Sequence, residues 1–272
     1  MNKKIALITV NFENHSVTES FLNCFKDLNC FGVKTFVADL SYNKGFLTEN
    51  NIIHVIPGEN KGYAYGINLG LAAAIKQGFD KFVVINNDTR VGEQFINHTY
   101  QSLINNNPAI ISGKIYYEAG FEYYKHYRKE DLGKVIWYAG GNIDWNNVYI
   151  RHRGVDEVDS AGKYDQLEET DFVSGCLMCF NKQVIDQVGF WDQGYFLYYE
   201  DADYCLRAKR KGIKLIYDPS IIIWHKNAQS TQGPGSKLHQ KCQNISRLKF
   251  GLKYAPFKTK LHLLKNYLFT SN

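Results

Sequence analysis

Short apolar runs alternate with amphipathic segments through the first 105 residues, and this alternation constrains the fold most. The runs at 5–10, 33–38, 52–56 and 82–85 are rich in Val, Ile and Phe, as buried strands are. Between and after these runs, apolar residues recur every three or four positions, which is typical of helices. The pattern predicts an α/β fold with a mainly parallel sheet and helices on both faces.

Polar residues follow each predicted strand. They are Asn11, Asp39, the segment 57–62 and the segment 86–88. In open α/β sheets, ligands bind beyond the carboxyl ends of the strands. We therefore expect these residues to converge on one crevice.

Asn86-Asn87-Asp88 ends the fourth predicted strand. A carboxylate in a nucleotide crevice can hold Mg²⁺ or Mn²⁺, which neutralises a diphosphate. Asn and Asp also favour turns, and a turn explains this segment equally well when it is taken alone.

A glycine-rich segment, NKGYAYGINLG at 60–70, joins the third predicted strand to a helix. Glycines let the backbone approach a ligand, and helix N-termini favour anions. The glycine spacing is not that of the dinucleotide fingerprint. Phosphate binding and close helix–sheet packing both remain open for this segment.

Three carboxylates stand at the predicted start of a helix, in Glu200-Asp201-Ala202-Asp203, and the far end of that helix is basic. This polarity alone suits a helix dipole. It does not explain the surrounding aromatic residues, which are Tyr195, Phe196, Tyr198, Tyr199 and Tyr204. Because apolar surroundings raise the pKa of a carboxylate, they can make it a usable general base.

His225 ends the apolar run 221–224 and can face the same crevice, although a lone histidine is more often structural. Between 113 and 170 periodicity fades, which predicts irregular structure and short hairpins that face an acceptor. Cys176 and Cys179 have no second cysteine pair at zinc-ligand spacing. We interpret them as small buried residues.

The net charge of +5 is unevenly distributed. Residues 226–272 contain nine Lys or Arg and no acid, which leaves a net charge of −4 on the first 225 residues. A negative core argues against nucleic-acid binding, and a basic tail favours an anionic surface.

Within the tail, apolar residues at helical spacing alternate with lysines. They are Phe257, Leu261, Leu264 and Leu268, with Lys258, Lys260 and Lys265. This pattern predicts association with the anionic inner face of a membrane, and packing of the helix back on the domain is the alternative. The chain has no apolar run of 18 residues and its start is too quickly polar for a signal peptide, so we expect a cytoplasmic, peripheral protein.

Four blocks carry a family resemblance: ENKGYAYGINLG, VINNDTRV, the stretch from VSGCLMCF to YFLYYEDADYCLRAKRKG, and IIIWH. Their order and spacing resemble the inverting glycosyltransferase family 2, of GT-A (Rossmann-like) fold, and especially its bacterial rhamnosyltransferase branch. The resemblance runs from about Ile5 to His225. It implies halves at 1–112 for the nucleotide-sugar and 113–230 for the acceptor, followed by a basic helical tail at 231–272.

The resemblance also implies roles for matching positions. The implied donor-binding residues are Asn11, Asp39, Asn60, Lys61, Gly62, Asn86, Asn87 and Asp88. Asp88 and His225 would hold a divalent metal, Mn²⁺ or Mg²⁺, and Asp201 would be the general base. The acceptor would contact Gly175, Trp191 and Glu200. This sequence departs from the family pattern at two places. The DXD-type motif reads Asn86-Asn87-Asp88 and has only one acid. After Asp39 the sequence reads LSYNKG, where the family more usually has an Asn-x-Ser-x-Asp pattern.

The resemblance implies transfer from a UDP- or dTDP-sugar, such as dTDP-rhamnose, to a hydroxyl of a cell-surface polysaccharide or lipid-linked acceptor. One alternative is a non-catalytic protein that binds nucleotide-sugars or glycans. Another is a nucleotidyltransferase, but such an enzyme normally has a basic, glycine-rich loop where NFENHS follows the first strand here.

Overall fold

The computed structural model describes residues 4–26, 32–122, 126–160, 162–226 and 236–270. Within these ranges ten strands form one sheet, in the order β10-β12-β6-β11-β4-β1-β2-β3, with β5 beside β12 and β7 beside β6. The strands are β1 Ile5–Asn11, β2 Val33–Asp39, β3 Ile53–Pro57, β4 Lys81–Ile85, β5 Thr89–Val91, β6 Ala109–Tyr117, β7 Ile136–Tyr138, β10 Glu168–Glu169, β11 Leu177–Asn181 and β12 Lys214–His225. A separate hairpin pairs β8 Gly141–Asp144 with β9 Tyr149–His152.

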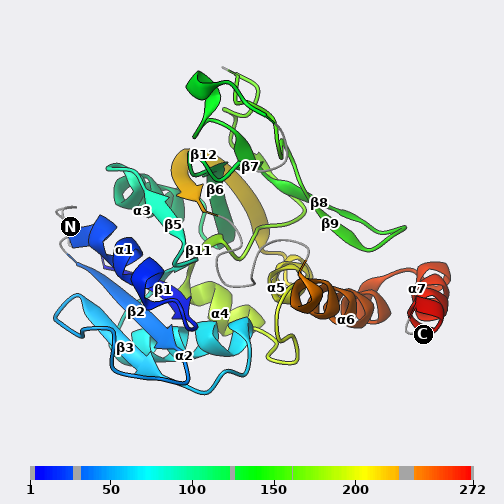
Figure 1. The fold of residues 1–272 in the computed structure, drawn as a ribbon, viewed down its shortest axis with the longest axis horizontal. Helices are drawn as coiled ribbons and strands as arrows, with labels where there is room; N and C mark the ends of the chain where they lie inside the picture. The colour runs from blue at the N-terminus through cyan, green and yellow to red at the C-terminus, as the bar shows by residue number, and fades with distance from the viewer. Residues whose placement is uncertain (1–3, 27–31, 123–125, 161, 227–235, 271–272) are drawn as a thin grey trace.

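The helices flank this sheet in the first part of the chain and extend away from it at the end (Figure 1). They are α1 His15–Lys26, α2 Tyr63–Lys76, α3 Phe95–Asn105, α4 Lys182–Val188, α5 Glu200–Lys209, α6 Lys237–Tyr254 and α7 Phe257–Thr270, with a 3₁₀ turn at Lys129–Asp131.

The first four strands are parallel and have the order β3-β2-β1-β4. From β1 the chain moves outward to β2 and β3, then returns through α2 to β4 on the other side of β1. Because crossovers are right-handed, this reversal puts α1 and α2 on opposite faces of the sheet. It also makes the carboxyl ends of β1 and β4 a switch point, where such sheets bind ligands. The predicted α/β fold is confirmed.

The sheet is mixed beyond β4, because β11 runs antiparallel between β4 and β6. The prediction of irregular structure from 113 onward is wrong for β6, which extends to Tyr117 and crosses residue 112. Lys114 interrupts the apolar pattern of this strand, yet it is buried, with Nζ 2.8 Å from Asp159 and 2.7 Å from Asp165. Those two carboxylates compensate the charge that made the segment look unlike a strand.

The two strands predicted at 213–217 and 221–224 form one strand, β12, with a register shift between Asp218 and Ile222. Gly113 on β6 makes this irregularity possible. A Cβ atom at Gly113 would lie 2.1 Å from the carbonyl oxygen of Ile221, so only glycine permits the close approach of the two strands.

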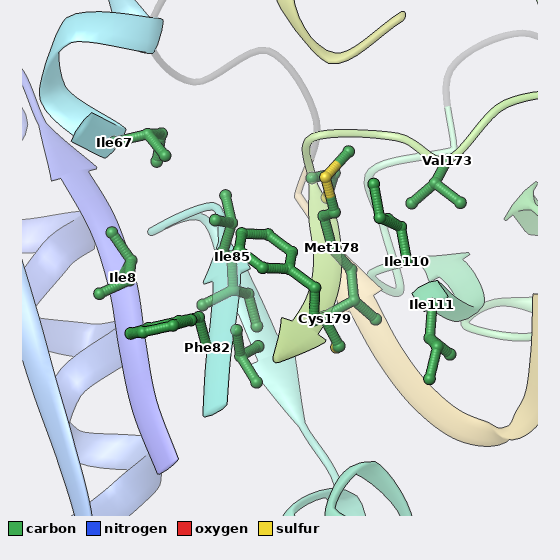
Figure 2. Packing of buried hydrophobic residues seen from close by; sticks show 14 of the residues in the cluster. Ile8, Ile67, Phe82, Ile85, Ile110, Ile111, Val173, Met178 and Cys179 are labelled. Atoms are coloured by element: carbon green, nitrogen blue, oxygen red, sulfur yellow. The ribbon is translucent and has the colours of Figure 1, made fainter. Parts of the chain in front are cut away.

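The core lies along the central strands, with α2 packed on them (Figure 2). Ile8, Phe82 and Met178 are fully buried and come from three adjacent strands, and Ile67 covers them from the helix. Cys179 is buried in the same cluster, as predicted. Within the described ranges, no group of three or more His, Cys, Asp or Glu residues is arranged to hold a metal.

The residues Ser16-x-x-Glu19 have the pattern of a capping box, which predicts the helix cap at Ser16, but α1 already begins at His15. The Thr18 hydroxyl donates to the side-chain oxygen of Asn11 at 2.7 Å. This bond ties the first turn of α1 to the end of β1. The helical spacing of apolar residues in this segment predicts that Leu28 is also part of the helix, but Leu28 lies outside the described residues.

The basic tail forms α6 and α7. Phe250 of α6 is fully buried and its ring centroid lies 5.3 Å from that of Tyr199. Leu263 of α7 is buried, whereas Phe257 and Leu261 are 73% and 53% exposed. The side chain of Leu268 lies outside the described part of the chain. None of the described helices combines the length and the apolar character needed to cross a bilayer.

Candidate active site

A cavity of about 1060 Å³ opens at the carboxyl ends of β1 and β4. Its wall combines segments that lie far apart in the sequence. They include Asn60, Gly62, 86–88, Trp137, 149–152, 174–176, 196–201, His225 and, from α6, Leu238, His239 and Gln243. Of the strand-end segments, 57–62 and 86–88 contribute to this cavity, as predicted. The wall also includes residues 196–201, called the base segment below, and residues of the tail.

Asn11 and Asp39 lie directly beside each other in the β1–β2 register and are buried, not part of the cavity wall. The Asn11 amide donates to Asp39 at 2.8 Å and to the Ser41 hydroxyl at 3.0 Å. The Asn87 amide donates to the Thr18 hydroxyl at 2.7 Å, which in turn donates to Asn11. These bonds fix the ends of β1, β2 and β4 relative to one another.

The glycine-rich segment approaches the base segment closely at Gly62. This residue has φ 101°, and a Cβ atom there would lie 2.3 Å from the Phe196 carbonyl oxygen. The Tyr63 amide donates to that same oxygen at 2.9 Å. Lys61, in contrast, is exposed, forms an ion pair with Glu59 at 2.8 Å and does not line the cavity.

Asp88 and His225 meet at the cavity wall, with His225 Nε2 3.1 Å from Asp88 Oδ1. The antiparallel pairing of β5 with β12 places Thr89 opposite His225 and so brings Asp88 next to the imidazole. Burial lowers the pKa of His225, but the Cys176 thiol and the Asp88 carboxylate outweigh it, so the pKa lies well above its usual value.

An oxygen and an imidazole nitrogen suit Mn²⁺, and two protein ligands leave coordination positions for diphosphate oxygens and water. Asp88 and His225 lie side by side in the cavity wall, so the residues present fit the metal that the resemblance implies, which on binding would displace the imidazole proton.

Asp201 lines the cavity at the first turn of α5 and is half-buried. Its carboxylate accepts from the backbone amides of Gly175 and Ala202, both at 2.8 Å. Burial raises its pKa to about 6 against the lowering effect of these bonds. Burial and the neighbouring Asp201 charge raise the pKa of Glu200 well above the usual value. Burial therefore makes both carboxyls easier to protonate than exposed acids are.

Trp191, which the resemblance places at the acceptor, and Asp203, the third carboxylate of the acidic segment, both lie behind the cavity wall. Trp191 is 2% exposed and stacks on Tyr204 at 5.3 Å, and the cavity wall does not include it. Asp203 is fully buried and accepts from Arg207 Nε at 2.8 Å. It is thus not a helix cap, since the N-cap position of α5 is Tyr199.

Three aromatic residues of the site were not predicted. The Tyr63 hydroxyl donates to the Asn86 side chain at 2.9 Å and to the Gly175 carbonyl at 3.1 Å. The Trp137 ring lies edge-on to both His225, at 4.6 Å, and His152, at 4.4 Å. Burial lowers the pKa of His152 to about 4, so it is neutral at pH 7. The only sequence signal was the density of aromatic residues.

The sequence profile described as "Glycosyltransferase like family 2" matches residues 48–244. This range covers most of the chain and contains Asp88, Asp201 and His225. The chain belongs to this family.

Curated relatives in the comparison are distant. The low-salt glycan biosynthesis hexosyltransferase Agl10 of Haloferax volcanii is 23% identical over 216 residues, 78% of this chain and 63% of its own. The dTDP-rhamnosyl transferase RfbF of Shigella flexneri is 26% identical over 235 residues, 83% of this chain and 70% of its own. This family 2 chain thus spans less than two thirds of the length of the haloarchaeal relative.

Solved structures share the fold of this family 2 chain. GalNAc-T7, crystallised with UDP, GalNAc and Mn²⁺, superposes with a TM-score of 0.65 over 92% of this chain and 48% of its own, at 12% identity. The mannosyltransferase PcManGT of Pyrobaculum calidifontis, in complex with GDP-Man and Mn²⁺, gives 0.59 over 96% and 68%, also at 12% identity. These likenesses confirm the GT-A fold.

Proposed function

We propose that this chain is a metal-dependent inverting glycosyltransferase whose general base is Asp201. The observation that carries the proposal is the composition of one cavity wall. The wall contains the Asp88–His225 pair and a separate, half-buried carboxylate whose pKa is about 6. A metal-ligand pair and a base near neutrality are what transfer from a nucleotide-sugar to a hydroxyl requires.

The donor is proposed to be a UDP- or dTDP-sugar, such as dTDP-rhamnose, bound over the ends of β1 and β4. Asp88 and His225 would hold Mn²⁺ or Mg²⁺, which when bound neutralises charge on the diphosphate. Asn60, Gly62, Asn86 and Asn87 have side-chain or backbone groups near this end of the cavity. Asp39 and Asn11 support the floor beneath it through their mutual hydrogen bond.

At the other end, Asp201 would take the proton of the acceptor hydroxyl. The hydroxyl oxygen then forms a bond to the anomeric carbon while the bond from that carbon to the diphosphate oxygen breaks. The nucleoside diphosphate leaves with the bonding electrons, and the proton stays on the Asp201 carboxylate. A single displacement of this kind inverts the anomeric centre.

The acceptor is proposed to be a glycan or a lipid-linked sugar that lies against the aromatic part of the wall. Gly175 and Glu200 face this part of the cavity. The raised pKa of Glu200 favours its protonated form, which can donate a hydrogen bond to an acceptor oxygen, as a carboxylate cannot. Because Trp191 is buried behind Gly175, its role would be to support the wall.

A non-catalytic nucleotide-sugar or glycan-binding protein would need the same cavity but no base. The raised pKa of Asp201 favours an enzyme over such a binding protein. The loop after β1 contains Glu13 and no lysine or arginine, which argues against a nucleotidyltransferase.

Donor turnover decides between these functions. The protein would be incubated with a panel of UDP- and dTDP-sugars and glycan acceptors, with Mn²⁺, Mg²⁺ or EDTA, and nucleoside diphosphate release measured. We expect acceptor-stimulated, EDTA-sensitive release with one donor, and a product of inverted anomeric configuration by NMR. Binding of nucleotide-sugars without release from any of them would favour the binding protein.

We further propose that α7 holds the protein at the inner face of a membrane. Its exposed side carries Phe257, Leu261 and Leu264, and lysines flank them, while Leu263 packs inward. Apolar area combined with positive charge suits anionic lipid. Co-sedimentation with vesicles should require anionic lipid and be lost in Phe257→Ser/Leu261→Ser. Binding that is indifferent to lipid charge and to these substitutions would refute the membrane role.

A further inference from the structure

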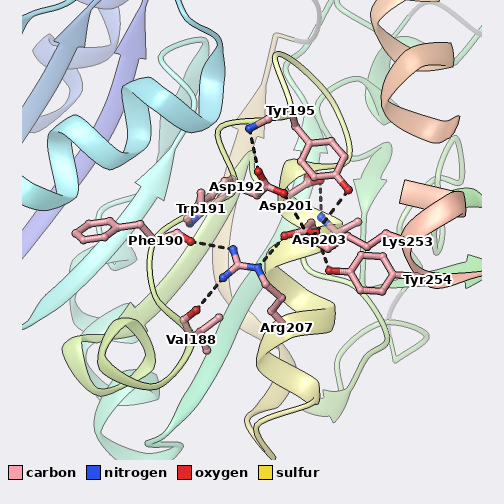
Figure 3. A network of polar contacts seen from close by, with 12 residues as sticks. Val188, Phe190, Trp191, Asp192, Tyr195, Asp201, Asp203, Arg207, Lys253 and Tyr254 are labelled. Atoms are coloured by element: carbon pink, nitrogen blue, oxygen red, sulfur yellow. Dashed lines mark hydrogen bonds and ion pairs between the residues drawn. The ribbon is translucent and has the colours of Figure 1, made fainter. Parts of the chain in front are cut away.

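The tail reaches α5, the helix that carries the proposed base, through an ionic cluster around one buried carboxylate (Figure 3). Lys253 Nζ of α6 donates to Asp203 Oδ1 at 2.6 Å, and the Tyr254 hydroxyl donates to the same oxygen at 2.7 Å. Arg207 donates to the other oxygen, Oδ2, at 2.8 Å. Asp203 is fully buried and stands two residues after Asp201. The Tyr195 hydroxyl also donates to Oδ1, at 3.5 Å. Four donors, two of them from α6, therefore converge on one carboxylate in the first turn of α5.

Arg207 extends the cluster to the loop before the site. Its guanidinium donates to the carbonyls of Val188 and Phe190, at 2.8 and 2.9 Å. Lys253 also lies 3.4 Å from Asp192. The cluster thus joins α6, α5 and the segment between α4 and α5.

A second set of contacts connects α6 to the residues just before α5. The Ser246 hydroxyl donates to the Leu197 carbonyl at 2.8 Å. Tyr198 and Tyr199 both have left-handed backbones, with φ 70° and 65°, which non-glycine residues rarely adopt. Their rings pack on His239 and Phe250 of α6, at 4.9 and 5.3 Å. Such a conformation persists only where surrounding structure enforces it, and here α6 supplies much of that structure.

The start of α5 has no side-chain cap, because Tyr199 occupies the N-cap position and makes no capping hydrogen bond. Without a cap, the direction of the first turn depends on tertiary contacts. Asp203 provides these contacts within one turn of the proposed base. The position of Asp201 in the cavity therefore depends on what holds Asp203.

We propose that α6 is a positioning element of the active site, in which Lys253 and Tyr254 hold Asp203 and thereby aim Asp201 at the acceptor. The inference rests on the proposed role of Asp201 as base. Lys253 and Tyr254 lie beyond residue 244, where the family match ends. The contacts that hold Asp203 therefore come in part from the tail of this chain. The tail would then support sugar transfer through α6 as well as membrane association through α7.

Substitution of Lys253 tests this role against simple structural support. Lys253→Met removes the charge and keeps the stem, and Lys253→Arg restores a donor. Lys249→Met is the matched control, because Lys249 lies on the same helix, is similarly exposed and pairs with Asp192 at 3.5 Å but not with Asp203. All variants would be assayed well below their melting temperatures, with the folded fraction measured by circular dichroism.

We expect Lys253→Met to lower kcat about 10- to 100-fold, as small misplacements of a catalytic group do, with donor KM within about twofold. Lys253→Arg should recover most of the loss, and Lys249→Met should match the wild type. A lower melting temperature with unchanged kcat for Lys253→Met would overturn the proposal, since the contact would then serve stability alone.

Hydrogen exchange gives a readout that does not need activity. The amides of 198–203 should exchange faster in Lys253→Met than in Lys249→Met. Equal exchange in the two variants would overturn the positioning role. If the wild type transferred no sugar while exchange still changed, the proposed function would fail but α6 would still be shown to order this segment.

Discussion

The two ends of the cavity differ in how their polar side chains are satisfied. At the proposed donor end, the wall residue Asn87 is linked through Thr18 to Asn11, and Asn11 to Asp39, both of which lie behind the wall. At the base end, Asp201 accepts only from backbone amides, and Glu200 Oε2 has no hydrogen-bond partner among the described residues.

The hydrogen bonds at one end fix the positions of side chains, whereas the burial at the other end changes the pKa values of carboxyls. A network of side-chain hydrogen bonds makes the proposed donor end a rigid platform, because each group is already fixed before a ligand arrives. Burial without a cation keeps the carboxylates at the base end protonatable near neutral pH. We therefore expect substitutions at the donor end to change binding and those at the base end to change turnover.

The largest effect is expected at the base. Asp201→Asn keeps the shape of the side chain but removes its basicity, so kcat should fall roughly 10²- to 10⁴-fold while nucleotide affinity stays nearly unchanged. Steady-state transfer and calorimetry of nucleoside diphosphate binding measure the two quantities. Glu200→Gln is the neighbouring control. Near-normal turnover in Asp201→Asn with loss in Glu200→Gln would assign the base to Glu200.

Loss of a metal ligand should mainly weaken binding. Asp88→Asn removes the charge of one proposed ligand, so nucleoside diphosphate affinity in Mn²⁺ should fall about 10- to 100-fold. In EDTA the variant and the wild type should bind equally weakly. Calorimetry with and without Mn²⁺ makes the comparison. Equal affinity of the wild type for nucleoside diphosphate in Mn²⁺ and in EDTA would show that binding does not depend on a metal.

A smaller change is expected at the contact between the two ends. Gly62→Ala places a Cβ 2.3 Å from the Phe196 carbonyl oxygen and strains a residue at φ 101°. If donor binding requires the present position of Gly62, a strain of about 1–3 kcal/mol corresponds to a loss of donor affinity of roughly 5- to 160-fold. Gly78→Ala is the control, since Gly78 also has a positive φ but nothing lies near its Cβ position. Similar donor affinity in both variants would show that backbone strain, not the contact, governs this position.

Local patterns were sufficient for the donor half of the fold. Apolar strands separated by amphipathic helices specify β1 to β4, and the order of polar strand ends specifies the crevice. The register of β1 with β2, which sets Asn11 beside Asp39, follows from this arrangement.

Contacts between distant segments could not be predicted in the same way. β6 looked irregular because Lys114 is neutralised by acids more than 40 residues away. Trp137 and His152 reach the cavity from an antiparallel hairpin region that has no clear periodicity. The docking of α6 on Asp203 depends on Lys253, which in the sequence is one basic residue among nine in the tail.

The pH dependence of kcat/KM tests most directly whether Asp201 is the base. Below its pKa the carboxyl is protonated and cannot accept the hydroxyl proton, so the rate should fall about tenfold per pH unit below pH 6. Glu200→Gln should keep this acidic limb, because the proposed base is intact in that variant, whereas Asp201→Asn should lose the limb along with most of the rate. An acidic limb that survives in Asp201→Asn and disappears in Glu200→Gln would contradict the account.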